Sequence, residues 1–467
     1  MLLRYFNPEQ LCFPPVAGQT LRADFEGGAL SSDFGALLLR GIDRQIGLTA
    51  RLAAAIRDKR HPSYIDHALR DLLAQRIYQI ASGYAEANDS NHLRRDPVFK
   101  LGGERRPLDA EDDLASAPTF SRLEHQMDRT DIYRVTRALV DHFIASYPEP
   151  PAAIVLDLDH SDDPTYGQQE FAFYNHHYQN HCYLPLFIFE GTSHALVTAV
   201  LRPGTRPPGA ENAMILVRLL SYLRHHWPYT HILVRGDSHF ATPEVIDVIA
   251  SYRGTDFVFG LAGNAVLLRQ AAATLQEARC LHHHRGALAH AHGQAPPPSS
   301  RLYAEFVYAA GSWTHPWRVV LKAEVMQAGD NPRFVVTSLE APTPQMLYED
   351  LYCARGNCEN EIKAVKNDLH SDRTSATTFL ANAMRLLLAC AAYVLHHALR
   401  THTLHHTALA QAQPSTVILT LFKIAAQIKQ YKDRILLHLP SSCPVQALLH
   451  RVTTLLCAVP DPVCNTS

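Results

Sequence analysis

The sequence lacks segments of the kind that direct a protein out of the cytosol. Its first residues, MLLRYFNPEQLCFPP, have neither the basic start nor the long apolar run that is typical of a signal peptide. A later apolar run, MRLLLACAAYVLHHALR, carries Arg and His, and we find no run long enough to span a bilayer. We therefore expect a cytoplasmic protein without a membrane segment.

Cysteine is sparse and scattered along the chain. The nine cysteines form neither a CxxC pair nor a dense framework. They are Cys12, Cys182, Cys280, Cys353, Cys358, Cys390, Cys443, Cys457 and Cys464. This spacing argues against a zinc ribbon and predicts reduced thiols in a cytosolic protein.

The chain also lacks a large net charge of either sign. The sequence has 43 Lys and Arg and 45 Asp and Glu, which gives a formal net charge of −2 at pH 7. A passive polyanion binder is usually basic overall, so this balance counts mildly against that class. A net charge near zero is still compatible with an enzyme that acts on nucleic acid, because acidic residues elsewhere can balance a basic groove. The 28 His would add positive charge below neutral pH.

A length of 467 residues is too great for one simple core and predicts two to four domains. Residues 29–95 place apolar side chains at intervals of three and four, NDSNHLRRDPVFKLGG breaks this pattern, and APTFSRLEHQMDRTDIYRVTRALVDHFI starts another helix. Together they predict an all-helical region over residues 1–150. From residue 151 the period changes. Short apolar runs such as AAIVLDLD, and then alternating strand and helix patterns, predict an α/β layer over residues 151–264.

Strand-like runs over residues 265–340 predict a small β-rich insertion. Within it, residues 281–300 are rich in His, Ala and Pro, and we interpret them as a flexible loop. A metal site built from these histidines is the alternative. Residues 341–400 and 401–467 are predicted to be helical, and basic residues mark the last region: Lys423, Lys429, Lys432 and Arg434.

Three acids follow apolar strand-like runs in the α/β layer. In IVLDLDHSDD, Asp157 and Asp159 point to the same face of a strand, where they repel unless a cation lies between them. HILVRGDSHF places Asp237 at the carboxyl end of another strand, where α/β sheets build their sites. Strand ends that reach solvent, or a turn-forming Asp, are the simpler alternatives.

A fourth acid lies in LYCARGNCENEIKAVKNDLHSDR. Tyr352, Arg355, Glu359, Lys363 and Lys366 are spaced three, four, four and three, which predicts one stripe on a helix. Glu361 falls outside that stripe. Taken alone, the stripe favours a solvated, salt-bridged surface.

The acids together predict more than any one of them. Mg²⁺ prefers carboxylate oxygens, and two ions about 3.5–4 Å apart can clamp a phosphoryl transfer. Two strand-end Asp and one helix Glu could bridge such a pair, with the neighbouring Arg and Lys on DNA phosphates.

The stretch around Glu359 also carries a family pattern. Tyr352, Arg355, Glu359 and Lys366 stand as Y-x2-R-x3-E-x6-K, which resembles the signature of DDE transposases of the insertion sequence 4 superfamily, and most closely the insertion sequence 1380 family. The blocks LDLDHSDDPTYGQQE, VRGDSHFATPEV and PTFSRLE resemble further blocks of that family, in the expected order from about residue 25 to 400.

The resemblance implies an α/β fold with an RNase-H-like core over residues 151–264 and 341–400, interrupted by the β-rich insertion. It implies Asp159, Asp237 and Glu359 as catalytic acids, with Asp157 as runner-up for the first. All four acids are implied as ligands of Mg²⁺ or Mn²⁺, with two ions. Tyr352, Arg355, Lys363 and Lys366 are implied as DNA-binding residues, and residues 1–150 as a DNA-binding domain.

The implied activity is that of a bacterial transposase that binds terminal inverted repeats, cuts the DNA and joins it to a target. The implied partner is double-stranded DNA, bound by a homodimer at the nucleoid. His125 stands where the family usually has Asn, and the only tryptophans after Asp237 are Trp313 and Trp317, in the insertion. An inactive DNA-binding descendant and a metal-dependent nuclease without strand transfer are the alternatives.

Overall fold

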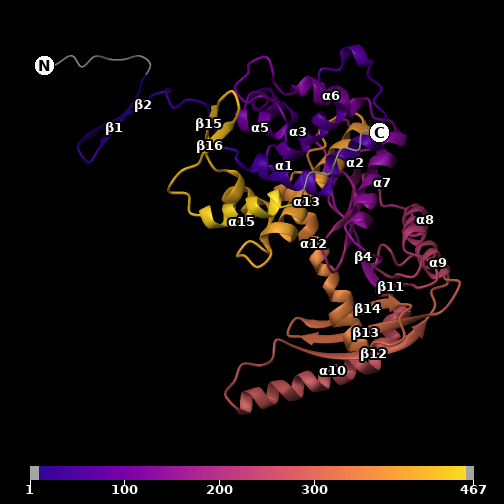
Figure 1. Ribbon diagram of the computed structural model, residues 1–467. Coiled ribbons are helices and arrows are strands. Elements are labelled where there is room, and N and C mark those ends of the chain that lie inside the picture. Colours follow the sequence, from indigo (N-terminus) through magenta and orange to yellow (C-terminus); the bar gives the residue numbers. More distant parts are fainter. Residues whose placement is uncertain (1–9, 459–467) are drawn as a thin grey trace. The chain divides into compact units, whose positions relative to one another are not determined.

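The computed structural model describes residues 10–458, and the chain forms two compact units (Figure 1). The first contains Met1–Gln126, Asp368–His370 and Ala391–Ser467, as far as they are described. The second contains Met127–Asn367 and Ser371–Cys390. The outermost residues of the predicted regions 1–150 and 401–467, Cys464 among them, lie outside the described residues.

Helices dominate the first unit, as the apolar spacing predicted. In the first helix Leu38, Leu39 and Ile42 are buried on one face, and Gly47, with a φ of 65°, separates it from the second. That backbone conformation favours glycine. The helical segments are α1 (Gly35–Ile46), α2 (Leu48–Ala55), η1 (Pro62–Tyr64), α3 (Leu69–Ala81), η2 (Ala87–Asp89), α4 (Ser90–Leu93), α5 (Pro97–Gly102), α6 (Ala117–His125), α14 (Pro414–Val417), η7 (Ile418–Phe422) and α15 (Gln446–Cys457).

The first unit also contains strands that were not predicted. A hairpin joins β1 (Leu11–Val16) and β2 (Gln19–Ala23), and a second sheet has the order β16-β15-β3, with β3 (Leu30–Ser31), β15 (Ala426–Gln430) and β16 (Ile435–His438). The predictions of an all-helical N-terminal region and a helical C-terminal region are wrong at these positions. Lys429 lies in β15, and Lys432 and Arg434 lie in the following turn. Runs this short do not show whether their period is that of a strand or a helix.

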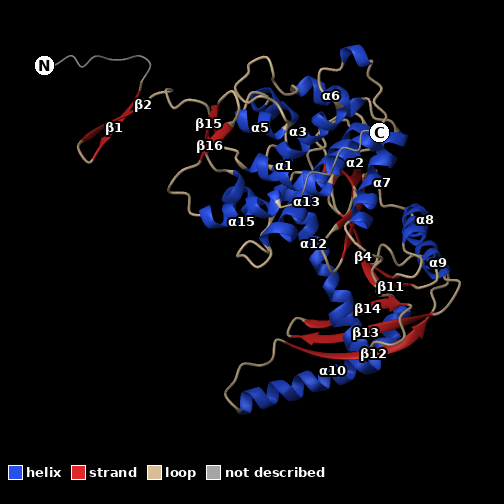
Figure 2. Cartoon of the chain, in the orientation of Figure 1, coloured by secondary structure: helices blue, strands red, loops and turns tan. Residues whose placement is uncertain are grey.

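An eight-stranded mixed sheet runs through the second unit (Figure 2). Its order is β12-β13-β14-β11-β10-β4-β8-β9. The parallel strands are β4 (Ala153–His160), β10 (His231–Gly236) and β11 (Thr255–Leu261). The antiparallel strands are β8 (Leu186–Glu190), β9 (Leu196–Val200), β12 (Ser299–Tyr308), β13 (Trp317–Met326) and β14 (Gly329–Thr337). The strand predicted from AAIVLDLD is confirmed as β4.

Helices pack apolar side chains against this sheet. Leu156, Val234 and Phe257 of the parallel strands share one buried cluster with Leu220 and Ile246 of neighbouring helices. This burial holds the carboxyl ends of β4 and β10 in place. The helices of the second unit are α7 (Arg129–Ala145), α8 (Gly209–His226), α9 (Pro243–Ser251), α10 (Ala265–Ala291) and the turn α11 (Pro344–Met346), followed by the segments described below.

The predicted β-rich insertion differs from expectation in two respects. The strands β12 to β14 are present, and β14 pairs with β11, so they extend the main sheet. The prediction of a loop over residues 281–300 is wrong up to Ala291, where α10 ends; residues 292–298 do form a loop before β12 begins at Ser299. Buried Leu267, Ala271, Leu275 and Ala278 anchor the first turns, and Ala and Leu favour helix through the His-rich part.

A small sheet with the order β5-β7-β6 lies between β4 and β8 in the chain. It comprises β5 (Asp163–Pro164), β6 (Phe173–Asn175) and β7 (Asn180–Tyr183). β5 starts three residues after the end of β4, so the small sheet is attached close to Asp159.

One helix is long and apolar enough to cross a membrane by length and composition, which differs from the sequence expectation. It spans Phe379–Leu404, that is α13 (Phe379–Leu399) and η6 (Arg400–Leu404). Of its most apolar window, 83% is buried inside the protein, and the core helix of a soluble protein meets the same criterion.

Candidate active site

Asp157 is buried in an ion pair. It is 2% exposed, and its two carboxylate oxygens accept hydrogen bonds from Nε and Nη2 of Arg235 at 2.6 and 2.7 Å. Arg235 lies beside it on β10 and is 4% exposed. Burial raises the pKa of Asp157, and Arg235 opposes that rise. Both carboxylate oxygens of Asp157 are therefore bound by the guanidinium of Arg235.

Asp159 lies two residues later, near the carboxyl end of β4. Its side chain is 16% exposed, and its Oδ2 is 3.5 Å from Nη1 of Arg355. Burial raises the pKa of Asp159 to about 6; Arg355 opposes the rise, and the charges of Asp237 and Glu359 add to it. Asp159 therefore lies within electrostatic range of both other predicted acids.

Asp237 follows the end of β10. Gly236 pairs with Leu158 of β4, so the next residues of the two strands are Asp237 and Asp159. The backbone N–H of His239 donates to Oδ1 of Asp237 at 2.9 Å, and His239 Nδ1 is 2.9 Å from Oδ2. Burial opposes ionisation of Asp237, but the contacts with His239 prevail and lower its pKa. Asp237 stays ionised in mildly acidic solution, where Asp159 takes up a proton.

Glu359 lies on a helical run that changes geometry along its length. Its segments are η3 (Leu347–Tyr352, π-helical), η4 (Cys353–Arg355, 3₁₀), α12 (Gly356–Lys363) and η5 (Ala364–Asp368, π-helical). The prediction of a regular helix is wrong here, because it assumed about 3.6 residues per turn throughout. The members of the predicted stripe are still neighbours: Arg355 lies beside Tyr352 and Glu359, and Glu359, Lys363 and Lys366 line one cavity. Such π-helical insertions occur frequently at functional sites.

A cavity of about 290 Å³ connects Asp159 with Glu359. Its lining includes Asp159, His160, Ser161, Glu359, Ile362, Lys363, Lys366 and Asn367. Glu359 is 51% exposed, and its Oε1 is 3.8 Å from Nη2 of Arg355. Arg355 thus pairs with the first and third predicted acids, while Asp237 follows the adjacent strand.

The predicted DNA-binding residues have different surroundings. The Arg355 guanidinium lies 5.7 Å from the ring centre of Tyr352, whose hydroxyl packs against Gly260. Lys366 Nζ donates to the carbonyl and to Oδ1 of Asp162, both at 2.6 Å. Lys363 is exposed at the cavity, and no acid within residues 10–458 pairs with it.

Comparison with known proteins gives the family. The family model described as "Transposase DDE domain group 1" matches residues 13–460. The chain belongs to this family. This match confirms the prediction that the chain carries a transposase DDE domain.

Two further comparisons add little to this DDE-family assignment. No curated protein matches the chain. Among solved structures, a piggyBac transposase synaptic complex with hairpin DNA is similar, with 14% identity, 92% of this chain and 87% of that chain covered, and a TM-score of 0.40. We base no argument on a similarity of that size.

DDE transposases normally use divalent metals, and the acids of this family member suit a hard cation chemically. Within residues 10–458, however, no group of three or more His, Cys, Asp and Glu side chains is placed to hold a metal ion. Arg355 instead lies close to Asp159 and Glu359.

Other residues of the DDE-family site were not predicted. Glu361, which the sequence left beside the stripe, is 9% exposed and lies 3.5 Å from Nδ1 of His194. His239 was detectable from its position two residues after Asp237. Asp162 was not, because its partner Lys366 lies 204 residues away.

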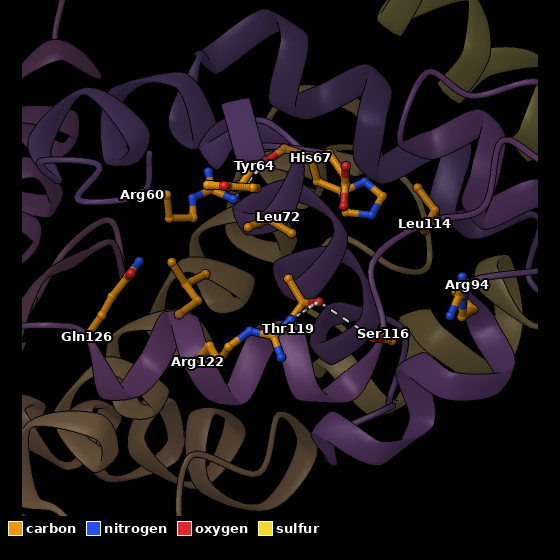
Figure 3. Close-up of a pocket in the computed structure, with 12 residues that line it drawn as sticks. Arg60, Tyr64, His67, Leu72, Arg94, Leu114, Ser116, Thr119, Arg122 and Gln126 are labelled. Carbon is orange, nitrogen blue, oxygen red and sulfur yellow. Dashed lines mark hydrogen bonds between the residues drawn. The ribbon is translucent and has the colours of Figure 1, made fainter. Parts of the chain in front are cut away.

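The helical unit of this family member contains a separate pocket of about 320 Å³ (Figure 3). Arg122 and Thr119 face it from α6, with Arg60 and Arg94 from other segments. Asp58 pairs with Arg60 and Asp113 with Arg94. Arg122 donates to Thr119 at 3.2 Å, and no acid in the described part of the chain pairs with it. The pocket therefore offers one uncompensated guanidinium to an anion.

Proposed function

We propose that this DDE-family protein is a DNA transposase. It binds the terminal inverted repeats of an insertion sequence, cleaves the DNA and joins it to a target by phosphoryl transfer. We place it in the insertion sequence 4 superfamily, nearest the insertion sequence 1380 family. The main support is the position of Asp159: Asp159 and Asp237 follow neighbouring parallel strands, and Glu359 lines a cavity with Asp159.

We infer that the core is RNase-H-like. The support is the order β9-β8-β4-β10-β11, in which β8 alone runs opposite to the other four strands. A second support is that α10 to β14 lie between these strands and Glu359 in the sequence. We retain the predicted division into a helical DNA-binding domain, a split core, an insertion and a C-terminal region as a proposal.

We assign the first acid to Asp159, because both oxygens of Asp157 are engaged by Arg235. Asp159, Asp237 and Glu359 would hold Mg²⁺ or Mn²⁺, and two such ions would supply Lewis-acid stabilisation of the phosphoryl group. Arg355 balances the charge of the first and third acids. Lys363 is best placed to contact a DNA phosphate at the cavity, as a mobile point charge.

DNA contacts outside the catalytic site are proposed for the helical unit. Arg122, in the pocket of Figure 3, is the main candidate, and the turn with Lys432 and Arg434 is a second. Both would bind phosphates and give affinity that falls with salt. We further propose a homodimer on DNA, because two element ends must be brought together, and a nucleoid-associated, cytoplasmic location in a bacterium.

The test is replacement of the third acid. Glu359→Gln removes a carboxylate that is half exposed at the cavity, so cleavage should fall to background while DNA binding stays within about twofold. Purified protein, labelled DNA with the repeats that flank its gene, and Mg²⁺ provide the assay. Cleaved and joined products are measured on a denaturing gel.

Glu361→Gln is the matched control, because it lies on the same helix but pairs with His194. It should keep cleavage within a few-fold of the wild type. If it is inactive and Glu359→Gln is active, the assignment of the third acid is wrong. Cleavage without joined products supports the nuclease, and a shifted band without cleavage supports the inactive binder.

A further inference from the structure

A second large cavity, of about 710 Å³, lies within the second unit. Helices α7, α8 and α13 and the edge strand β9 line it, and none of the predicted catalytic acids does. Its apolar lining includes Ile132, Val140, Ile215, Leu219, Leu380 and Leu387. Ligand sites in proteins typically have volumes of about 300–1,000 Å³ and mostly apolar walls. The size and the lining of this cavity therefore suit apolar side chains of another molecule.

Three guanidinium groups lie at this cavity without a carboxylate partner. They belong to Arg129, Arg137 and Arg218. Arg137 lies 4.2 Å from the ring centre of Tyr222, and Arg218 lies 5.7 Å from that of Tyr133. Within residues 10–458 no Asp or Glu forms an ion pair with any of the three arginines. Because an aromatic ring attracts an exposed cation only weakly, an anion beside these groups is still favourable.

The acids that line the cavity are engaged within the protein. Glu170 accepts a hydrogen bond from the backbone N–H of Phe379 at 2.9 Å. Glu211 forms an ion pair with the buried side chain of Arg202. Neither acid pairs with the three arginines. The cavity therefore favours an occupant that combines apolar side chains with negative charge.

The described chain begins with a hairpin whose apolar face is uncovered. Among residues 10–458 its strands β1 and β2 pair only with each other, and every residue of both strands is exposed. Leu11 lies opposite Ala23 and Phe13 opposite Leu21, so these four side chains share one face. A hairpin of two strands is marginally stable in water unless it packs against another element. We call residues 10–28 the N-terminal arm, and we expect this arm to need a partner surface.

The N-terminal arm also carries the charge that complements the cavity. Phe25 is 86% exposed and stands between Asp24 and Glu26. The backbone N–H of Glu26 donates to Oδ1 of Asp24 at 3.1 Å, which fixes the turn around Phe25. No cationic side chain in the described part of the chain pairs with either acid. An aromatic ring between two carboxylates thus matches an apolar cavity beside three guanidinium groups.

We propose that the N-terminal arm of one copy of this chain docks into the cavity of a second copy. Phe25 enters the apolar interior, and Asp24 and Glu26 lie beside the three arginines. Both copies carry an arm and a cavity, so the same contact forms twice about a two-fold axis and the assembly closes at two copies. The inference rests on the proposed homodimer and names its interface. Because the arm docks without DNA, the dimer forms before any element end is bound.

Sedimentation velocity of the full chain, without DNA and without divalent metal, tests this contact. The wild type should sediment as a dimer at micromolar concentration. Phe25→Ala should raise the dimer dissociation constant by about 10²-fold or more, because it removes one aromatic anchor from both contacts. Arg218→Glu should act in the same direction, because it reverses a charge beside the acids of the arm. Both replaced side chains are exposed, so the fold of each variant should be retained.

Two exposed residues outside the arm and the cavity provide matched controls. Tyr229, which precedes β10, is 97% exposed, and Arg253 is exposed in the turn before β11. Tyr229→Ala removes an exposed ring as Phe25→Ala does, and Arg253→Glu reverses a charge as Arg218→Glu does. Both control variants should leave the dimer dissociation constant unchanged.

A mixture of the Phe25→Ala and Arg218→Glu chains shows whether the arm docks on a second copy. The first variant has an intact cavity and the second an intact arm, so a mixed dimer regains one of the two contacts. Mixed dimers should therefore form more readily than dimers of either variant. A monomeric wild type, a dimer that neither variant weakens, or a mixture without mixed dimers overturns the inference.

Failure of the proposed function gives a different result. A chain that cuts no element-end DNA but dimerises through the arm refutes the transposase and leaves this inference intact. A chain that cuts and joins DNA while both variants stay dimeric overturns this inference alone.

Discussion

Asp157 and Asp159 have the same side chain on the same strand, but they have different neighbours. Asp157 lies beside Arg235, which donates hydrogen bonds to both of its carboxylate oxygens. Asp159 lies beyond the reach of that guanidinium and shares its surroundings with two other acids. The first is a buried ion pair, whose loss leaves an uncompensated charge. The second is a carboxylate kept ionised against its environment, which is typical of functional sites.

The contrast predicts opposite effects on stability. The pKa of Asp159 rises from 3.8 to about 6 in the folded state, so folding favours the protonated form and stability falls as pH rises from about 4 to about 6. Asp159→Asn should therefore raise the free energy of unfolding at pH 8 by up to about 3 kcal/mol, with little gain at pH 4. Urea unfolding at both pH values measures the effect.

Asp157→Asn serves as the comparison. It leaves Arg235 buried without its carboxylate, so at pH 8 it should lower the free energy of unfolding by about 3–5 kcal/mol. If the two variants change stability in the same direction, the separation of a structural from a catalytic acid is wrong.

At the scale of elements, a close backbone approach at Gly204 holds the hairpin formed by β6 and β7, residues 173–183. The carbonyl of Gly204 accepts a hydrogen bond from Nδ2 of Asn175 at 2.9 Å. A Cβ at Gly204 would overlap the carbonyl oxygen of Cys182 and lie 2.7 Å from that of Phe173. These oxygens belong to the backbone and cannot rotate away, so the absence of a side chain at 204 sets the position of the hairpin.

Gly204→Ala should therefore displace the hairpin. We expect a loss of about 1–3 kcal/mol in the free energy of unfolding, as for other overpacked sites. Thermal unfolding measures the effect. Gly167→Ala is the control, because a Cβ there meets only Gln169 Oε1 at 3.5 Å. Equal behaviour of both variants would show that the close approach does not position the hairpin.

At the scale of the whole molecule, the helical unit is assembled from both ends of the described chain. Nε2 of Gln45 in α1 donates to the carbonyl of Leu455 in α15 at 2.9 Å. Gly35 packs so closely on Phe422 that a Cβ would overlap it. The N-terminal helices thus depend on residues about 400 positions later. The main sheet of the second unit contains no strand from beyond residue 404.

Ending the chain at residue 404 should therefore lower the local stability of the first unit and leave that of the second unit unchanged. It removes Phe422 and Leu455 from α1, so amide hydrogens of Gly35–Ile46 should exchange at rates near those of an unfolded peptide. Those of β4 and β10 should stay protected, because local stability follows local packing. Hydrogen exchange with mass spectrometry measures both. Unchanged protection in α1 would contradict the dependence on the C-terminal residues.

The sequence by itself determined the strands that carry the acids, their order, and the family, because those signals are local: an apolar run, an acid at its end, and a motif of fixed spacing. It did not determine which acid of IVLDLD is bound on both oxygens by Arg235, because Arg235 lies 78 residues away in the chain. It also missed the π-helical turns around Glu359 and the helix through the His-rich segment. Only the tertiary structure decided these points, because pairing, register and burial join residues that the chain keeps far apart.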